Sequence, residues 1–72
     1  MRYMVVIEKS DTSYGAFVPD LPGCIAVAES ETEVVELITE AIQFHLENLK
    51  TTGVFIPQAM SKGVFIDIPS FS

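Results

Sequence analysis

The sequence predicts a small α+β domain with the element order β-β-β-α-β, and three features of the chain support this prediction. Short runs of β-forming residues at 2–8, 14–18 and 24–28 are separated by turns too short for a crossover connection. A capping box at Ser30–Glu33 opens a long amphipathic stretch. A last apolar run, Gly63–Ile68, follows that stretch. We therefore expect one antiparallel or mixed sheet with a single helix on one of its faces.

The first three strands are expected to form an antiparallel meander. Arg2–Glu8 is rich in β-formers and is followed by a polar run, and Tyr14–Val18 forms the second strand. Asp20–Gly23 is a strong turn signal, because its proline presets φ and its glycine tolerates a positive φ. Cys24–Ala28 then forms the third strand, and Gly63–Ile68 is expected to add the fourth after the helix.

The helix is expected to run from Glu31 to about Lys50, where Thr51, Thr52 and Gly53 end it. At about 100° per residue, one face is polar and consists of Glu36, Glu40, Gln43 and Glu47. The opposite face is apolar and consists of Val34, Ile38, Ala41, Ile42, His45 and Leu49. The pattern predicts that the helix covers one sheet face and leaves the other free for a partner.

The composition combines a net charge of −6 with 49% hydrophobic residues and a mean hydropathy of +0.38. So acidic a chain argues against direct nucleic-acid binding, which needs basic surface, and suits a basic protein partner. The apolar excess predicts a homodimer or tetramer, with an apolar-rich monomer as the alternative.

Cys24 is the only cysteine, so an intrachain disulfide is impossible and a reducing compartment is favoured. The apolar run Met4–Ile7 is too short for a signal peptide or a membrane span. We therefore expect a cytoplasmic protein that does not associate with membranes.

Candidate catalytic groups are few. Glu8, Glu33 and Asp67 could be imagined as a metal site, but most helix carboxylates lie on the outer face and Asp67 is flanked by isoleucines. His45 has no serine or cysteine at a useful spacing and fits a core histidine better. Cys24 has no basic neighbour to lower its pKa and is expected to be a small buried hydrophobe. We expect no catalytic residue, no metal and no cofactor.

The stretch Tyr14–Cys24 reads Tyr-Gly-Ala-Phe-Val-Pro-Asp-Leu-Pro-Gly-Cys, and the helix contains Glu-Ala-Ile-Gln-Phe-His-Leu-Glu at residues 40–47. These two motifs, at this separation, resemble the HicB family of antitoxins over roughly Tyr3 to Pro69. The family has a Ser or Thr at the helix cap, where this chain has Ser30. It usually has Gly-Asp before that cap, where this chain has Ala28 and Glu29.

The resemblance implies a partial RNase H-like fold without RNase H activity. It also implies a partner, a small basic HicA-like toxin that cleaves mRNA and whose active site the antitoxin covers. Longer HicB antitoxins add a DNA-binding domain; residues 1–72 are expected to form one HicB-like domain without one. Two rival hypotheses remain: an orphan interaction domain with another partner, and a cryptic metal-dependent nuclease.

We predict that a basic partner is held partly by the most exposed residues of the densest motif, while acids on the outer face of the helix steer its association. The motif residues are Tyr14, Phe17, Pro19, Asp20, Leu21 and Pro22, and the helix residues are Glu36 and Glu40. In the alternative interpretation the motif only shapes the turn, and Leu21 packs inward.

Overall fold

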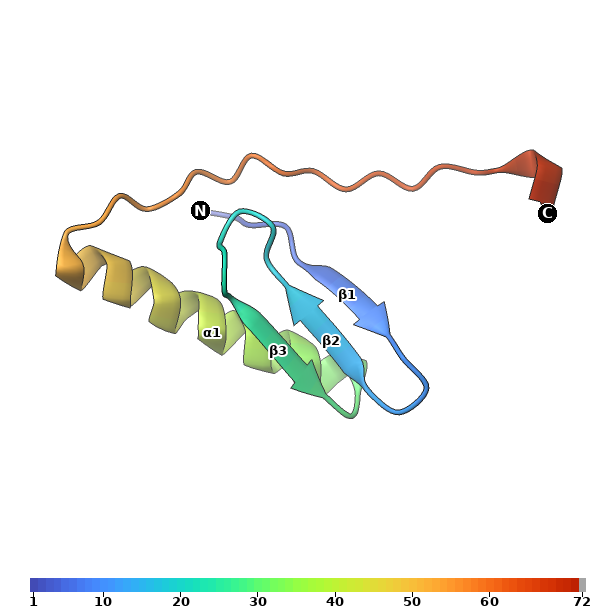
Figure 1. Cartoon of the computed structure of the whole chain (residues 1–72), viewed down its shortest axis with the longest axis horizontal. Coiled ribbons are helices and arrows are strands. Elements are labelled where there is room, and N and C mark those ends of the chain that lie inside the picture. Colours follow the sequence, from blue (N-terminus) through green and yellow to red (C-terminus); the bar gives the residue numbers. More distant parts are fainter. Residues whose placement is uncertain (72) are drawn as a thin grey trace.

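A computed structural model describes residues 1–71 and places the strands and the helix in the expected order (Figure 1). The strands are β1 (Val6–Lys9), β2 (Tyr14–Phe17) and β3 (Ile25–Ala28). They are followed by the helix α1 (Glu31–Thr52) and a 3-10 turn, η1 (Pro69–Phe71). The three strands form one antiparallel sheet in the order β1-β2-β3. The α+β class and the meander are therefore confirmed.

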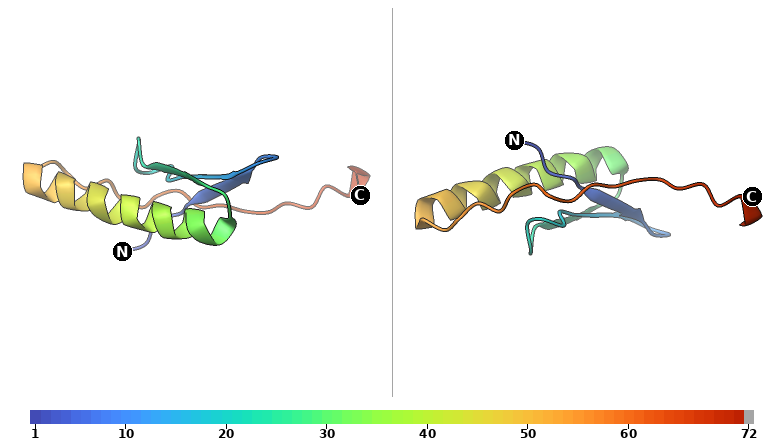
Figure 2. Two further views of the ribbon diagram at one scale, coloured as in Figure 1. Left: turned by 90° about the horizontal axis from the view of Figure 1, so that it is seen from below. Right: turned by 90° about the horizontal axis from the view of Figure 1, so that it is seen from above.

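Helix and sheet form two layers, as Figure 2 shows, with α1 packed on β2 and β3. Side chains alternate along the strands, so only every second residue reaches the helix. The buried core lies between the two layers and consists of Ala16, Val18, Leu21, Cys24, Val34 and Ile38. As expected, Cys24 is a buried apolar residue; His45, by contrast, is only half-buried.

Side-chain and backbone caps define both ends of α1. The Ser30 hydroxyl accepts a hydrogen bond from the Glu33 amide at 3.1 Å, which confirms the predicted N-cap. The same hydroxyl donates to the Glu33 carboxylate at 3.2 Å, so the carboxylate reaches back to the Ser30 side chain. At the other end Gly53 has a φ of 75°. The amides of Gly53 and Val54 donate to the carbonyls of Lys50 and Leu49, which is the Schellman arrangement.

Two consecutive turns build the loop between β2 and β3. The Leu21 amide donates to the Val18 carbonyl at 3.0 Å, and the Cys24 amide donates to the Leu21 carbonyl at 3.1 Å. A third bond, from the Val18 amide to the Cys24 carbonyl at 3.2 Å, closes the loop at its base. Each turn has a proline at its second position, and Gly23 takes the positive φ of 84° that the second turn requires.

The fourth strand expected at Gly63–Ile68 does not form within one chain, and this part of the prediction is wrong. Residues 54–68, which we call the arm, leave the helix end in an extended path and pass β1 without joining the sheet (Figure 1). A strand is stabilised by backbone hydrogen bonds to a neighbour, and no ladder bond to the arm is present in the described part of the chain. The apolar run at 63–68 therefore predicted a pairing that is absent from the described part of the chain.

The expectation that Leu21 is exposed is also wrong, because its side chain is completely buried beneath the two turns. We expect Leu21→Ala to lower the free energy of unfolding by about 2–5 kcal/mol, since the neighbours cannot collapse into the space left behind. Urea denaturation followed by circular dichroism measures this. Leu37→Ala is the matched control, because Leu37 is 43% exposed on the helix. Equal losses for the two variants would contradict the placement of Leu21.

Candidate partner-binding surface

The sheet face turned away from α1 is uncovered and apolar. Phe17 of β2 lies opposite Ile25 of β3, and its other neighbour across the sheet is Val6 of β1. Ile25 and Val27 are 67% and 66% exposed, and Phe17 is 37% exposed. The large residues of β3 face outward, while Ala26 and Ala28 face the helix. An apolar row therefore crosses the sheet with no layer above it.

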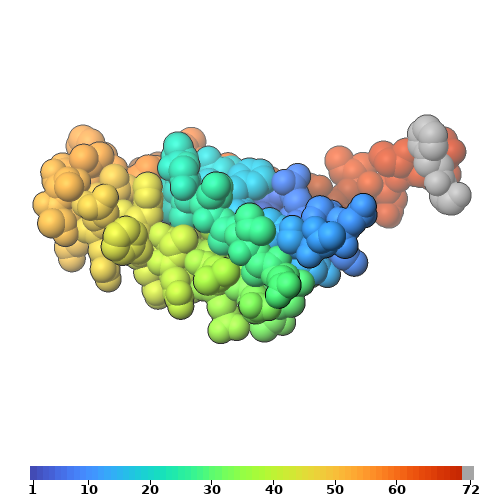
Figure 3. Space-filling model, turned by 60° about the horizontal axis from the view of Figure 1, so that its bottom comes forward, coloured from blue at the N-terminus to red at the C-terminus, as the bar shows by residue number. Residues whose placement is uncertain are grey.

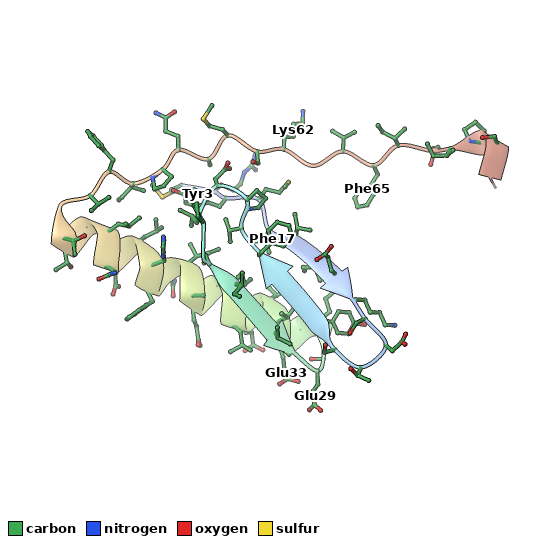
Figure 4. All side chains as sticks on the ribbon, in the orientation of Figure 1. Tyr3, Phe17, Glu29, Glu33, Lys62 and Phe65 are labelled. Atoms are coloured by element: carbon green, nitrogen blue, oxygen red, sulfur yellow. The ribbon has the colours of Figure 1, made fainter. Side chains whose placement is uncertain are left out.

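The outer face of α1 is a second, acidic surface. Glu36 and Glu40 are both exposed and, with Glu33 and Leu37, line a shallow depression of about 220 Å³. Figure 3 shows the helix and β3 side by side on one face of the molecule. Figure 4 places Glu29 and Glu33 close together where β3 gives way to the helix, which extends the acidic surface to that end.

The structure separates the two groups of residues that the sequence assigned to one interface. The apolar sheet face lies on one side of the two-layer domain, and the acidic helix face lies on the other. This follows because α1 turns one of its faces to the sheet and the opposite face to solvent. A single flat partner surface cannot touch Phe17 and Glu40 together. The residues predicted to bind a partner therefore lie on two separate surfaces.

The residues of the β2–β3 loop are divided between core and surface. Pro19 and Pro22 are exposed at the second positions of their turns, whereas Leu21 is in the core. Tyr14 is half-buried at the start of β2, and the Lys9 ammonium group lies 5.8 Å from the centre of its ring. Of this loop, the two prolines are thus the residues best placed to contact a partner.

Asp20 is engaged within the chain. Its carboxylate accepts hydrogen bonds from the Met60 amide at 2.9 Å, the Ser61 amide at 2.8 Å and the Ser61 hydroxyl at 2.8 Å. The hydrogen bonds from the Ser61 amide and hydroxyl are the largest causes that lower the pKa of Asp20 below its ordinary value. Asp20 therefore ties the β2–β3 loop to the arm, a role that its turn position did not predict.

Other candidate chemistry finds no support in the described residues. Across residues 1–71, no three His, Cys, Asp or Glu side chains come together as metal ligands. Burial raises the pKa of the Cys24 thiol, which opposes the thiolate that nucleophilic chemistry needs.

Ile25 and Val27 were missed as candidate binding residues by sequence reasoning, although a signal was present. Residues 25–28 alternate large and small as Ile-Ala-Val-Ala. In a strand that packs under a helix, small residues allow close approach, so the alanines mark the covered face and the larger residues mark the open one. The open face could thus have been located from the sequence.

The fold and the surface together define a small two-layer α+β domain whose sheet leaves one apolar face open. The chain belongs to the HicB-like antitoxin family of bacterial toxin-antitoxin systems, whose model matches residues 3–72. The resemblance noted from the two motifs is therefore confirmed over nearly the whole chain.

Curated relatives come from phage, archaea and bacteria. An uncharacterized 14.9 kDa protein in the rep-hol intergenic region of Haemophilus phage HP1 is 31% identical over 71 residues; the match covers 99% of this chain and 53% of the phage protein. A UPF0150 protein of Archaeoglobus fulgidus is 42% identical over 59 residues, covering 78% of this chain and 86% of that one. A UPF0150 protein of Helicobacter pylori is 44% identical over 50 residues, covering 69% of each. No solved structure matches the chain.

This chain thus spans about half the length of the phage relative. Among residues 1–71, α1 and the other helical segment are too short or too polar to cross a membrane.

The anchor at Asp20 should respond to pH. A carboxylate with a lowered pKa stabilises the folded arrangement above its unfolded pKa of about 3.9, and this contribution is lost as the pH falls through the lower folded value. We expect Asp20→Asn at neutral pH to reproduce the acid state, with greater backbone motion at Met60 and Ser61 in ¹⁵N relaxation. Asp67→Asn, in the exposed part of the arm, is the control. Unchanged relaxation in Asp20→Asn would disprove the anchor.

Proposed function

We propose that this chain is the protein-binding module of a type II toxin-antitoxin system and neutralises a HicA-like mRNA-cleaving toxin by covering its active site. In this proposal it acts by binding and not by catalysis, as a homo-oligomer in the cytoplasm. The toxin contacts the open sheet face and the exposed prolines of the β2–β3 loop. Membership of an antitoxin family supports the role in general terms.

The observation that carries the proposal is the uncovered row of Phe17, Ile25 and Val27. Monomeric soluble proteins seldom leave a contiguous apolar patch on a sheet face, and such patches mark interaction sites. Aromatic residues near the centre of an interface also tend to dominate its binding energy. An antitoxin that must exclude RNA from a toxin needs a stable, desolvated contact of this kind.

Electrostatics supports a basic partner, and in this proposal the helix acids steer its approach. The net charge of −6 attracts a basic toxin and speeds encounter. The domain is 17 Å deep along its shortest axis, whereas the Debye length at physiological salt is about 8 Å. If the toxin docks on the open sheet face, Glu36 and Glu40 lie beyond one Debye length and act mainly at low ionic strength.

We expect Ile25→Asp to weaken binding of a HicA-like toxin encoded beside this chain by at least about tenfold, because it places a charge in the centre of the apolar contact. The fold should survive, since Ile25 is exposed. Calorimetry with the purified toxin and an RNA-cleavage assay measure the loss. Val35→Asp is the control, since Val35 is 42% exposed on the helix. Full neutralisation by Ile25→Asp, or failure of Val35→Asp alone, would refute this interface.

Charge reversal tests the steering role separately. We expect Glu36→Lys together with Glu40→Lys to slow association at low salt and to flatten its salt dependence. The dissociation rate and the stability should change little, because both residues are exposed. Stopped-flow or surface plasmon resonance at several ionic strengths measures the association and dissociation rates. A faster dissociation at physiological salt would place the toxin on the helix face instead.

A further inference from the structure

We propose that residues 63–68 of the arm form the fourth strand on the sheet of a second copy of this chain, along the outer edge of β1. Each copy donates its arm and receives the arm of its partner. The proposal gives the homo-oligomer a structural basis and does not rest on the antitoxin role.

The arm is attached to its own domain only in its first half. The Tyr3 hydroxyl donates to the Pro57 carbonyl, and Asp20 holds Met60 and Ser61 through three hydrogen bonds. At Gly63 the arm still lies close to the body, because a Cβ at this position would fall 2.9 Å from the Met4 sulfur. The direction of the arm is therefore set up to residue 63.

Beyond Gly63 the arm has the composition of a strand and the exposure of an unfolded peptide. Val64, Phe65 and Ile66 are 69%, 105% and 75% exposed. Figure 4 shows Phe65 projecting from the arm on the side of β1, where it stays fully exposed. Fully burying a side chain such as these contributes about 1.5–3 kcal/mol, and an exposed side chain forgoes that contribution. The pattern predicts a strand whose neighbour is missing.

The shape of the chain agrees with this interpretation. A compact domain of 72 residues has a radius of gyration of about 11 Å, whereas that of this chain is 14.4 Å. The longest axis measures 49 Å, and the arm extends along it past the sheet (Figure 1). The five residues 64–68 reach on the order of 17 Å in extended form, enough for a strand of ordinary length.

The edge of β1 offers a matching place. Within residues 1–71, β1 has β2 on one side and no strand on the other. A groove of about 440 Å³ runs between β1 and the arm and is lined by aliphatic, aromatic and glycine residues: Met4, Val5, Val6, Ile7, Gly63, Val64 and Phe65. An open edge beside an apolar groove is a template for strand addition.

A second copy fits this groove better than the arm of the same chain. The same arm already forms one wall of the groove through Gly63, Val64 and Phe65, and it then continues past the sheet without pairing with β1 (Figure 1). An arm and a receiving edge on one chain are self-complementary, so two copies can exchange arms about a two-fold axis and close. Phe65 alone would supply on the order of 200 Å² of the roughly 800 Å² that each partner buries in a stable interface.

Sedimentation equilibrium of the full chain at tens of micromolar tests the proposal. We expect a mass twice 7.9 kDa for the wild type and a single-chain mass for Phe65→Asp, with the helix content and melting of the body retained. Phe55→Asp is the matched control, because Phe55 is 95% exposed in the proximal arm and should leave the dimer intact. A wild-type monomer would overturn the dimer as well, whereas a dimeric Phe65→Asp would overturn the exchange alone. Neither result bears on toxin binding.

Cysteine cross-linking distinguishes exchange from closure within one chain. Val6→Cys and Ile66→Cys are combined in one chain and oxidised, while Cys24 stays in place because it is buried. Arm exchange predicts a covalent dimer on a non-reducing gel, and a mixture of the two single variants should yield the mixed dimer by mass spectrometry. An internally closed monomer, or no cross-link at all, would refute the pairing with β1 of a second copy.

Discussion

The loop between β2 and β3 is the constraint on which the rest of the molecule depends. Its two turns, each built on a proline, meet at Leu21, and the side chain of Leu21 points into the core and is fully buried there. The same turns present Asp20 outward to the amides of Met60 and Ser61. Seven residues, Val18–Cys24, therefore fix both the sheet–helix packing and the path of a segment forty residues further along the chain. These two structural roles explain why two prolines, a glycine and an aspartate occur within so short a stretch.

One-sided packing follows from that core. Because Leu21, Val34 and Ile38 meet on the helix side of the sheet, the helix can cover only that side, and within residues 1–71 no second α-helix covers the other side. Small side chains on the covered face of β3 let the helix approach, and the large ones are left on the open face. The open apolar surface is thus a direct consequence of a single α-helix covering one face of the sheet.

Interactions between residues close in the sequence made the helix predictable. Contacts between residues far apart in the sequence determine the features that the sequence did not predict. Ser30 and Glu33 define the helix start through bonds three residues apart, so the pattern alone was enough. The burial of Leu21 needed the two successive turns to be built in space, and its turn position alone suggested exposure. The fourth strand predicted at 63–68 is absent, because a strand needs a neighbour to pair with, and the residues of the run do not specify that neighbour. Likewise, sequence spacing alone did not show that Glu36 and Phe17 lie on opposite layers of the domain.

The two exposed apolar regions are distinct and therefore compatible. Phe17, Ile25 and Val27 lie on the face of the sheet, whereas the strand that the arm would form joins the edge of the sheet beside β1. An added edge strand extends a sheet in its own plane, so it enlarges the open face without covering it. A dimer made by exchanging arms would accordingly still present its apolar row to a partner, and the acidic helices would remain on the outer surface. For a domain of this size, which buries a smaller fraction of its surface than larger proteins do, an exchanged strand also adds core that one chain cannot supply.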